Sequence, residues 1–250
     1  MSPNGLPPLW IDGMAFGARV LRGGDDPWDT PGELGLFLRE LASLLALDIV
    51  DIDIGAGIAA FARAQGIERT DSAGIEDLLS DAGLRTRLKR GIETATGALG
   101  ARPLALALPG PGALAQALMD QGEIDEDVLD DLAMALADLL RALVVPAIGV
   151  LRFTEADPRA LEFFEPLTNI ARHYEMTSVL VMPGAADEAT GFDRIYGSAA
   201  AADGRILAPA FWEGGDVALA GDTPVFTEVP VSLVPETVLA KLRVLSESAS

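Results

Sequence analysis

The stretch Val145–Gly184, VPAIGVLRFTEADPRALEFFEPLTNIARHYEMTSVLVMPG, decides the fold of this chain. An apolar run ends near the charged residues Arg152 and Glu155, and Pro158 then starts an amphipathic helical pattern. A second apolar run follows and ends in Pro-Gly. This order predicts a strand–helix–strand unit with polar side chains at the exit of its first strand. In α/β barrels such an exit is where the chemistry takes place.

The same alternation continues along most of the chain. Short apolar runs bounded by glycine, proline or charge predict strands at 9–15, 47–54, 103–108, 147–153, 177–182, 206–212 and 225–231. Helical patterns occupy 32–46, 75–99 with a break at Gly83, 125–144, 159–175 and 236–246. The alternation predicts one α/β domain over residues 1–250, either a (β/α)8 barrel or a doubly wound sheet. Residues 1–8 form an extension in this interpretation, and the irregular stretch 185–204 is an active-site loop.

The composition excludes several classes of function. The 250 residues carry a formal net charge of −20, which disfavours binding to nucleic acids or anionic membranes. The chain has no cysteine, so disulfides, thiolate metal ligands and cysteine nucleophiles are excluded. The N-terminus does not read as a signal peptide, and no apolar run approaches the roughly 20 residues that span a bilayer. We therefore expect a cytoplasmic protein that acts on a small molecule.

Charged side chains at two predicted strand exits are the leading catalytic candidates. Asp51 and Asp53 alternate with isoleucine and so point to one side of a strand, with Asp53 nearer its C-terminal end. A carboxylate there would accept hydrogen bonds from substrate N–H groups or serve as a general acid or base. The alternative, given equal weight, is a buried structural aspartate that is hydrogen-bonded to backbone groups or paired with a neighbouring arginine. Arg152 is a candidate clamp for a substrate carboxylate, with Glu155 beside it, or these two form a structural ion pair.

Other residues are weaker candidates. Trp212 and Glu213 end a predicted strand and Glu228 lies on the last one, which suggests an aromatic wall and two carboxylates for substrate binding. His173 is the one histidine, and its place late in a helical segment suggests an outer groove. The strand–glycine–helix junction at 108–115 has N–H groups that could hold an anion, although its prolines remove donors.

Four segments resemble, in chain order, the uroporphyrinogen decarboxylase and cobalamin-independent methionine synthase superfamily. They are LALDIVDIDIGAGIAAFARAQG (45–66), GARPLALALPGPGALAQAL (100–118), DPRALEFFEPLTNIAR (157–172) and PVSLVPETVLAKLRV (230–244). The resemblance implies a (β/α)8 TIM-type barrel, incomplete or distorted because the chain is short for the family. It implies a cofactor-free lyase acting on a small carboxylated or pyrrole-like compound. Asp53 would stabilise charge, Arg152 would clamp a carboxylate and Trp212 would form a binding wall.

The departures from the family narrow the expected chemistry. Val181 and Pro183 stand where methyl-transferring members place the histidine and cysteine of a zinc site, so we expect no metal. Arg19 and Arg22 lie in what reads as a glycine-rich loop, without the arginine-rich segment of true uroporphyrinogen decarboxylases. Two alternatives stay open: methyl transfer linked to a folate or corrinoid without zinc, and a catalytically inactive binding subunit. The candidate protein partners are a second copy, as a homodimer, and a corrinoid protein.

Overall fold

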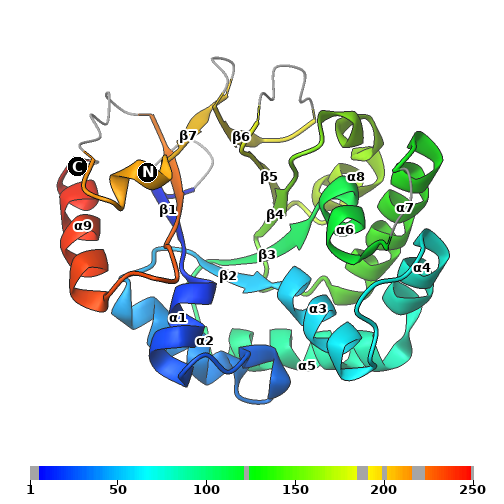
Figure 1. The fold of residues 1–250 in the computed structure, drawn as a ribbon, viewed down its shortest axis with the longest axis horizontal. Helices are drawn as coiled ribbons and strands as arrows, with labels where there is room; N and C mark the ends of the chain where they lie inside the picture. Colours follow the sequence, from blue (N-terminus) through cyan, green and yellow to red (C-terminus); the bar gives the residue numbers. More distant parts are fainter. Residues whose placement is uncertain (1–5, 121–123, 185–190, 199–201, 216–222, 249–250) are drawn as a thin grey trace.

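The sheet is a nearly closed barrel of parallel strands with helices packed around it (Figure 1). A computed structural model describes residues 6–120, 124–184, 191–198, 202–215 and 223–248. The strands are β1 (Leu9–Asp12), β2 (Val50–Asp53), β3 (Leu104–Pro109), β4 (Val150–Thr154), β5 (Thr177–Met182), β6 (Arg194–Gly197), β7 (Gly204–Ile206) and β8 (Val225–Glu228). The helices are α1 (Met14–Arg22), α2 (Leu34–Leu44), α3 (Ile54–Ala64), α4 (Ser72–Ser80), α5 (Ala82–Leu99), α6 (Pro111–Leu118), α7 (Glu126–Leu143), α8 (Glu165–His173) and α9 (Pro235–Ser248). Three short 3₁₀ turns are η1 (Pro27–Asp29), η2 (Pro158–Phe163) and η3 (Pro209–Phe211).

The barrel has one open seam. The eight strands follow the order β1-β8-β7-β6-β5-β4-β3-β2, so β1 pairs with β8 and β2 pairs with β3. Within the described residues no backbone ladder joins β1 to β2. The predicted α/β barrel is therefore confirmed in its distorted form, and side chains must hold the two seam strands together.

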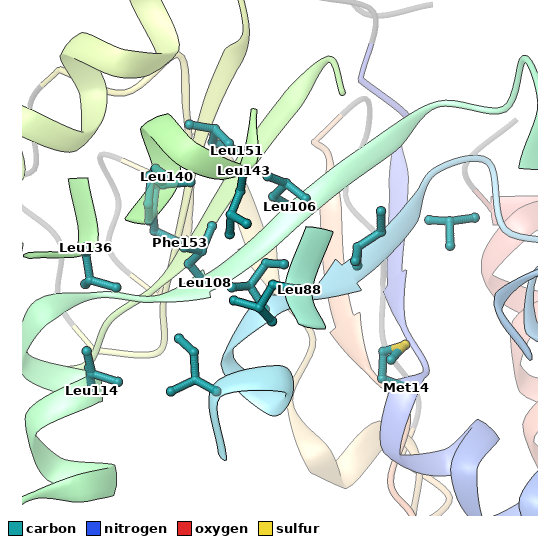
Figure 2. Packing of buried hydrophobic residues seen from close by; sticks show 14 of the residues in the cluster. Met14, Leu88, Leu106, Leu108, Leu114, Leu136, Leu140, Leu143, Leu151 and Phe153 are labelled. Carbon is teal, nitrogen blue, oxygen red and sulfur yellow. The ribbon is translucent and has the colours of Figure 1, made fainter. Parts of the chain in front are cut away.

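Alternation along each strand separates the core into two layers. Inside the barrel lies a small cluster of Leu6, Trp10, Ile49, Ala105, Val150, Val179, Val181, Tyr196 and Phe226. The larger layer fills the space between the sheet and the helices. Figure 2 shows Leu106 and Phe153 of the sheet in that outer layer, with Leu140 and Leu143 of α7. Val150 of β4 lies inside the barrel and Phe153 lies outside it. Because side chains alternate along a strand, Arg152 points into the barrel like Val150.

Two expectations for the second half of the chain are wrong. The stretch 185–204 is not simply a loop, because it contains β6 and the first residue of β7, while 185–190 and 199–201 lie outside the described residues. The strand expected at 206–212 ends at its first residue. Pro209 has no N–H for a ladder and starts η3 instead.

Two further corrections concern helices. Arg19 and Arg22 belong to α1 and not to a glycine-rich loop. Gly17, which weakens the helical pattern in sequence, is needed for packing, because a Cβ there would lie 2.6 Å from Leu41 Cδ1 on α2. The break between α4 and α5 falls at Asp81, before the expected Gly83, because the Asp81 carboxylate accepts backbone N–H groups at the start of α5.

None of the helices within the described ranges combines the length and apolar character needed to cross a membrane.

Candidate functional site

A cavity of about 790 Å³ opens at the C-terminal ends of the barrel strands. Its volume falls within the roughly 300–1,000 Å³ of small-molecule sites, and its position is the one that carries chemistry in α/β barrels. Most of its lining is apolar and comes from strand ends and from α3 and α6. The charged and hydroxyl groups that line it lie at four strand ends and are Asp12, Asp53, Arg152, Thr154 and Glu228.

Arg152 lies at the floor of this cavity and its side chain is almost wholly buried. Its Nη2 lies 2.7 Å from Asp12 Oδ2 and 3.2 Å from Asp51 Oδ2, and its Nη1 donates to Thr154 Oγ1 at 3.2 Å. The guanidinium also lies 5.2 Å from the centre of the Phe226 ring. A guanidinium can hold a carboxylate through two hydrogen bonds either at its Nε–Nη2 edge or at its Nη1–Nη2 edge. Both edges include Nη2, which in Arg152 already contacts Asp12 and Asp51. The expected bidentate clamp therefore has no free edge.

The same contacts close the open seam of the barrel. The indole N–H of Trp10 on β1 donates to Asp51 Oδ2 on β2 at 3.1 Å. Arg152 reaches from β4 to Asp12 on β1 and to Asp51 on β2. We call Trp10, Asp12, Asp51 and Arg152 the seam cluster. It takes the place of the missing backbone ladder between β1 and β2.

The seam cluster holds two carboxyl groups against one cation, which shifts the pKa of its members. Burial raises the pKa of Asp51 to about 7, the Arg152 charge opposes this rise, and the Asp12 carboxylate adds to it. Burial alone would lower the pKa of Arg152, but Asp51 and Asp12 more than offset this and hold its pKa above the ordinary value. Asp51 Oδ1 is buried and has no hydrogen-bond partner in the described structure. The carboxyl group of Asp51 is therefore a proton-holding group near neutral pH.

The stability of the chain should depend on the proton held by Asp51. Its folded pKa of about 7 exceeds the unfolded value, so the folded chain binds this proton more tightly and loses stability as pH rises from 5 to 8. We expect Asp51→Asn to remove this loss, so the variant gains about 2 kcal/mol relative to wild type over that range. Urea unfolding at pH 5, 6.5 and 8 measures the difference. The exposed Asp130→Asn is the control, and a pH-independent difference for Asp51→Asn would contradict the assignment.

Asp53 lies at the rim of the cavity, where it also begins α3. Its Oδ1 accepts the backbone N–H of Ala56 at 2.9 Å, which makes it the N-cap of that helix. Burial and the nearby Asp12 carboxylate raise the pKa of Asp53 to about 6, although the Ala56 N–H opposes the rise. The pKa of Glu228 is likewise raised by burial and by Asp12. Asp53 and Glu228 are therefore cavity-lining carboxyl groups that hold protons more tightly than ordinary ones.

Glu155 has a different position from the one expected for a catalytic group. It is fully buried, it is not among the cavity-lining residues, and it forms no ion pair with Arg152. Its carboxylate accepts four backbone N–H groups at 2.8–3.2 Å, from Gly112, Ala113, Ala156 and Asp157. The anion held at the start of α6 is thus an internal carboxylate. The site as we define it does not include Glu155.

Gly110 makes this close approach possible. A Cβ at Gly110 would lie 2.4 Å from Glu155 Oε2, so any side chain there would displace the carboxylate. Gly110, at the junction before α6, therefore serves an internal contact in the described structure.

The remaining candidates divide between the cavity and the surface. Trp212 is buried, lines the cavity and donates its indole N–H to Thr227 Oγ1 at 3.1 Å. Glu213 is exposed and is not among the lining residues. His173 lies in an outer groove beside α7, as expected, together with the exposed Tyr174.

Sequence reasoning missed Asp12 and Thr154. Asp12 ends a short strand whose apolar pattern is weak, and only its place before Gly13 at a strand–helix junction signals a site residue. Thr154 follows Arg152 at the same parity on β4, which places both side chains inside the barrel. Among the described residues no group of three or more histidine, aspartate or glutamate side chains is arranged to hold a metal ion.

No protein-family model matches the chain, and no curated protein matches it.

Proposed function

We propose that the chain is a metal-free lyase of the decarboxylase kind, acting on a small pyrrole-like carboxylic acid at the mouth of its barrel. The chemistry is that of the uroporphyrinogen decarboxylase side of the superfamily that the sequence resembles. Asp53 would be the general acid, Glu228 and Asp12 would accept N–H groups of the substrate, and Trp212 would form part of the wall.

The charge balance of the cavity is the observation that carries this proposal. Among the residues that the structure describes, the carboxyl groups of Asp12, Asp53 and Glu228 line the cavity, and Arg152 is the one cation that lines it with them. That cation already contacts two aspartates. A ligand with N–H donors or developing positive charge complements such a site, whereas a ligand held mainly through carboxylates does not. Binding of a pyrrole-like ring through its N–H group is therefore favoured over binding of a ligand mainly through its carboxylate.

The proposed step transfers one proton and breaks one carbon–carbon bond. The protonated Asp53 carboxyl group donates its proton to the ring carbon that bears the carboxylate, and the ring becomes cationic. The bond to the carboxylate then breaks, its electron pair returns to the ring, and CO₂ leaves. Asp53 regains a proton from solvent. Carboxylates around the mouth stabilise the cationic ring, and their repulsion of the substrate carboxylate ends when neutral CO₂ forms.

Replacement of the acid should abolish most of the activity. With pyrrole-2-carboxylate and indole-carboxylates as substrates in D₂O, we expect release of CO₂ and incorporation of one deuteron at the ring carbon. NMR spectroscopy measures the deuteron. Asp53→Asn should lower the rate about 10²-fold or more, because general acid catalysis contributes typically that much. Asparagine still caps a helix well, so the start of α3 is preserved.

The pH dependence provides a second readout. Because the pKa of Asp53 is raised to about 6, its acid form is lost above that value, and the wild-type rate should fall as pH rises through about 6. Asp130→Asn, which alters an exposed carboxylate on α7, should behave as wild type. Absence of CO₂ release, combined with tighter binding of benzoate than of benzylamine, would refute the proposal.

A further inference from the structure

We infer that the substrate also carries an uncharged, apolar substituent, which lies in a groove between α3 and α6 while the ring faces the carboxyl groups. The inference rests on the proposed function, since the ring end is what those groups would bind. Both helices contribute to the lining of the same cavity, including Ala56 and Ala59 of α3 and Ala113 and Ala117 of α6. The groove is thus continuous with the polar floor.

The helices leave space for a ligand because small side chains face the cavity. Ala56 and Ala59 are three residues apart and Ala113 and Ala117 are four apart, so each pair lies on one face of its helix. Ala59 and Ala117 are both exposed at the cavity. Leu114, buried beneath them on α6, gives the groove an apolar base.

The charge distribution selects the kind of substituent. The residues of α3 and α6 that line the cavity are all glycine, alanine, leucine or isoleucine, and the charged lining groups all lie at strand ends. A carboxylate in the groove would lose its hydration without gaining a hydrogen-bond or charge partner, which costs free energy. Transfer of an apolar group from water into the groove is favourable. The groove therefore rejects the anionic side chains of a polycarboxylate and accepts alkyl or aryl groups.

The dimensions of the cavity set the size of the substituent. A single five-membered ring would leave most of the 790 Å³ to water against apolar walls. Leu118, the last residue of α6, lines the cavity and takes part in a backbone bridge. The carbonyl of Leu118 accepts the N–H of Thr70 at 2.9 Å, and the N–H of Asp120 donates to the Thr70 carbonyl at 2.8 Å. This bridge ties the chain after α3 to the end of α6, beside the cavity-lining Leu118.

A series of primary alkylamines tests the groove, because the ammonium group donates N–H groups to the same carboxyl groups. For ethylamine, butylamine and hexylamine, calorimetric titration should show Kd falling by up to about fourfold per methylene, the factor that corresponds to ~0.8 kcal/mol for each buried methylene. Ala117→Trp should fill the groove and remove this length dependence, while ethylamine binds within about twofold of wild type.

Gln116→Trp is the matched control, because Gln116 is exposed on α6, next to Ala117, and is not among the cavity-lining residues. It should keep the full length dependence. Affinity that does not change with chain length in wild type, or equal behaviour of the two tryptophan variants, would overturn the inference. Asp53→Asn should weaken all three amines alike and leave the length dependence intact. Hexanoate binding as tightly as hexylamine, with the length dependence intact, would overturn the carboxyl-centred function alone.

Discussion

Glu155→Ala should destabilise the chain by about 3–5 kcal/mol, one of the two largest losses we expect. The substitution removes the acceptor of four backbone N–H groups. The bonds from Gly112 and Asp157 are buried and those from Ala113 and Ala156 are partly buried. Each unsatisfied buried donor costs about 1–3 kcal/mol before water relieves part of it. Two of these groups begin α6, so this helix should loosen first. Urea unfolding monitored by circular dichroism measures the loss, with a melting temperature lower by roughly 10 °C or more.

Glu162→Ala is the matched control. Glu162 lies nearby in η2, but it is exposed, so its removal should change stability by no more than about 0.5 kcal/mol. A loss below about 1 kcal/mol for Glu155→Ala would show that the four N–H groups find other acceptors. If Glu155→Ala does not fold, Glu155→Gln keeps one carbonyl acceptor and should show an intermediate loss.

Arg152→Met should cost about 3–5 kcal/mol at pH 8, because it leaves Asp51 buried without its cation and removes the link between β1 and β2. The loss should be smaller at pH 5. Asp51 has a pKa of about 7 in the wild type, and its pKa rises further without the arginine charge. At pH 5 it is therefore protonated in both folded proteins, and the variant holds no uncompensated Asp51 carboxylate. Urea unfolding at the two pH values provides the comparison.

The double variant Arg152→Met with Asp51→Asn separates charge from packing. If an uncompensated carboxylate causes the loss, the double variant should be more stable at pH 8 than Arg152→Met alone, with a coupling free energy of about 1–3 kcal/mol. Additive losses at pH 8 would contradict the role of the seam cluster. Hydrogen exchange of β1 and β2 should quicken in Arg152→Met, because the seam is where the described sheet lacks a ladder.

Local patterns were enough to predict most of the elements. β5 occupies 177–182 as expected, since a short apolar run between polar residues has few alternatives. Strand β6 was missed because a four-residue strand among glycine, alanine and aspartate gives almost no periodic signal. The alternation argument for Asp53 and the strand-exit argument for Arg152 were sound for position, because both residues line the cavity. The same reasoning could not place Glu155, which lies beyond the last residue of β4.

The sequence by itself determined most of the succession of strands and helices, the parallel α/β class and the face of β2 on which Asp51 and Asp53 lie. Those properties depend on neighbours one to four residues apart, where the geometry of strand and helix is regular. Only the tertiary structure decided the partners. Arg152 contacts Asp12 from 140 residues away because the barrel brings β1 opposite β4, and Glu155 meets the N–H groups of α6 because Gly110 admits it. Such pairings depend on how far the sheet closes, and no local sequence pattern contains that information. For this reason Arg152, expected to clamp a substrate carboxylate, is instead a member of the seam cluster.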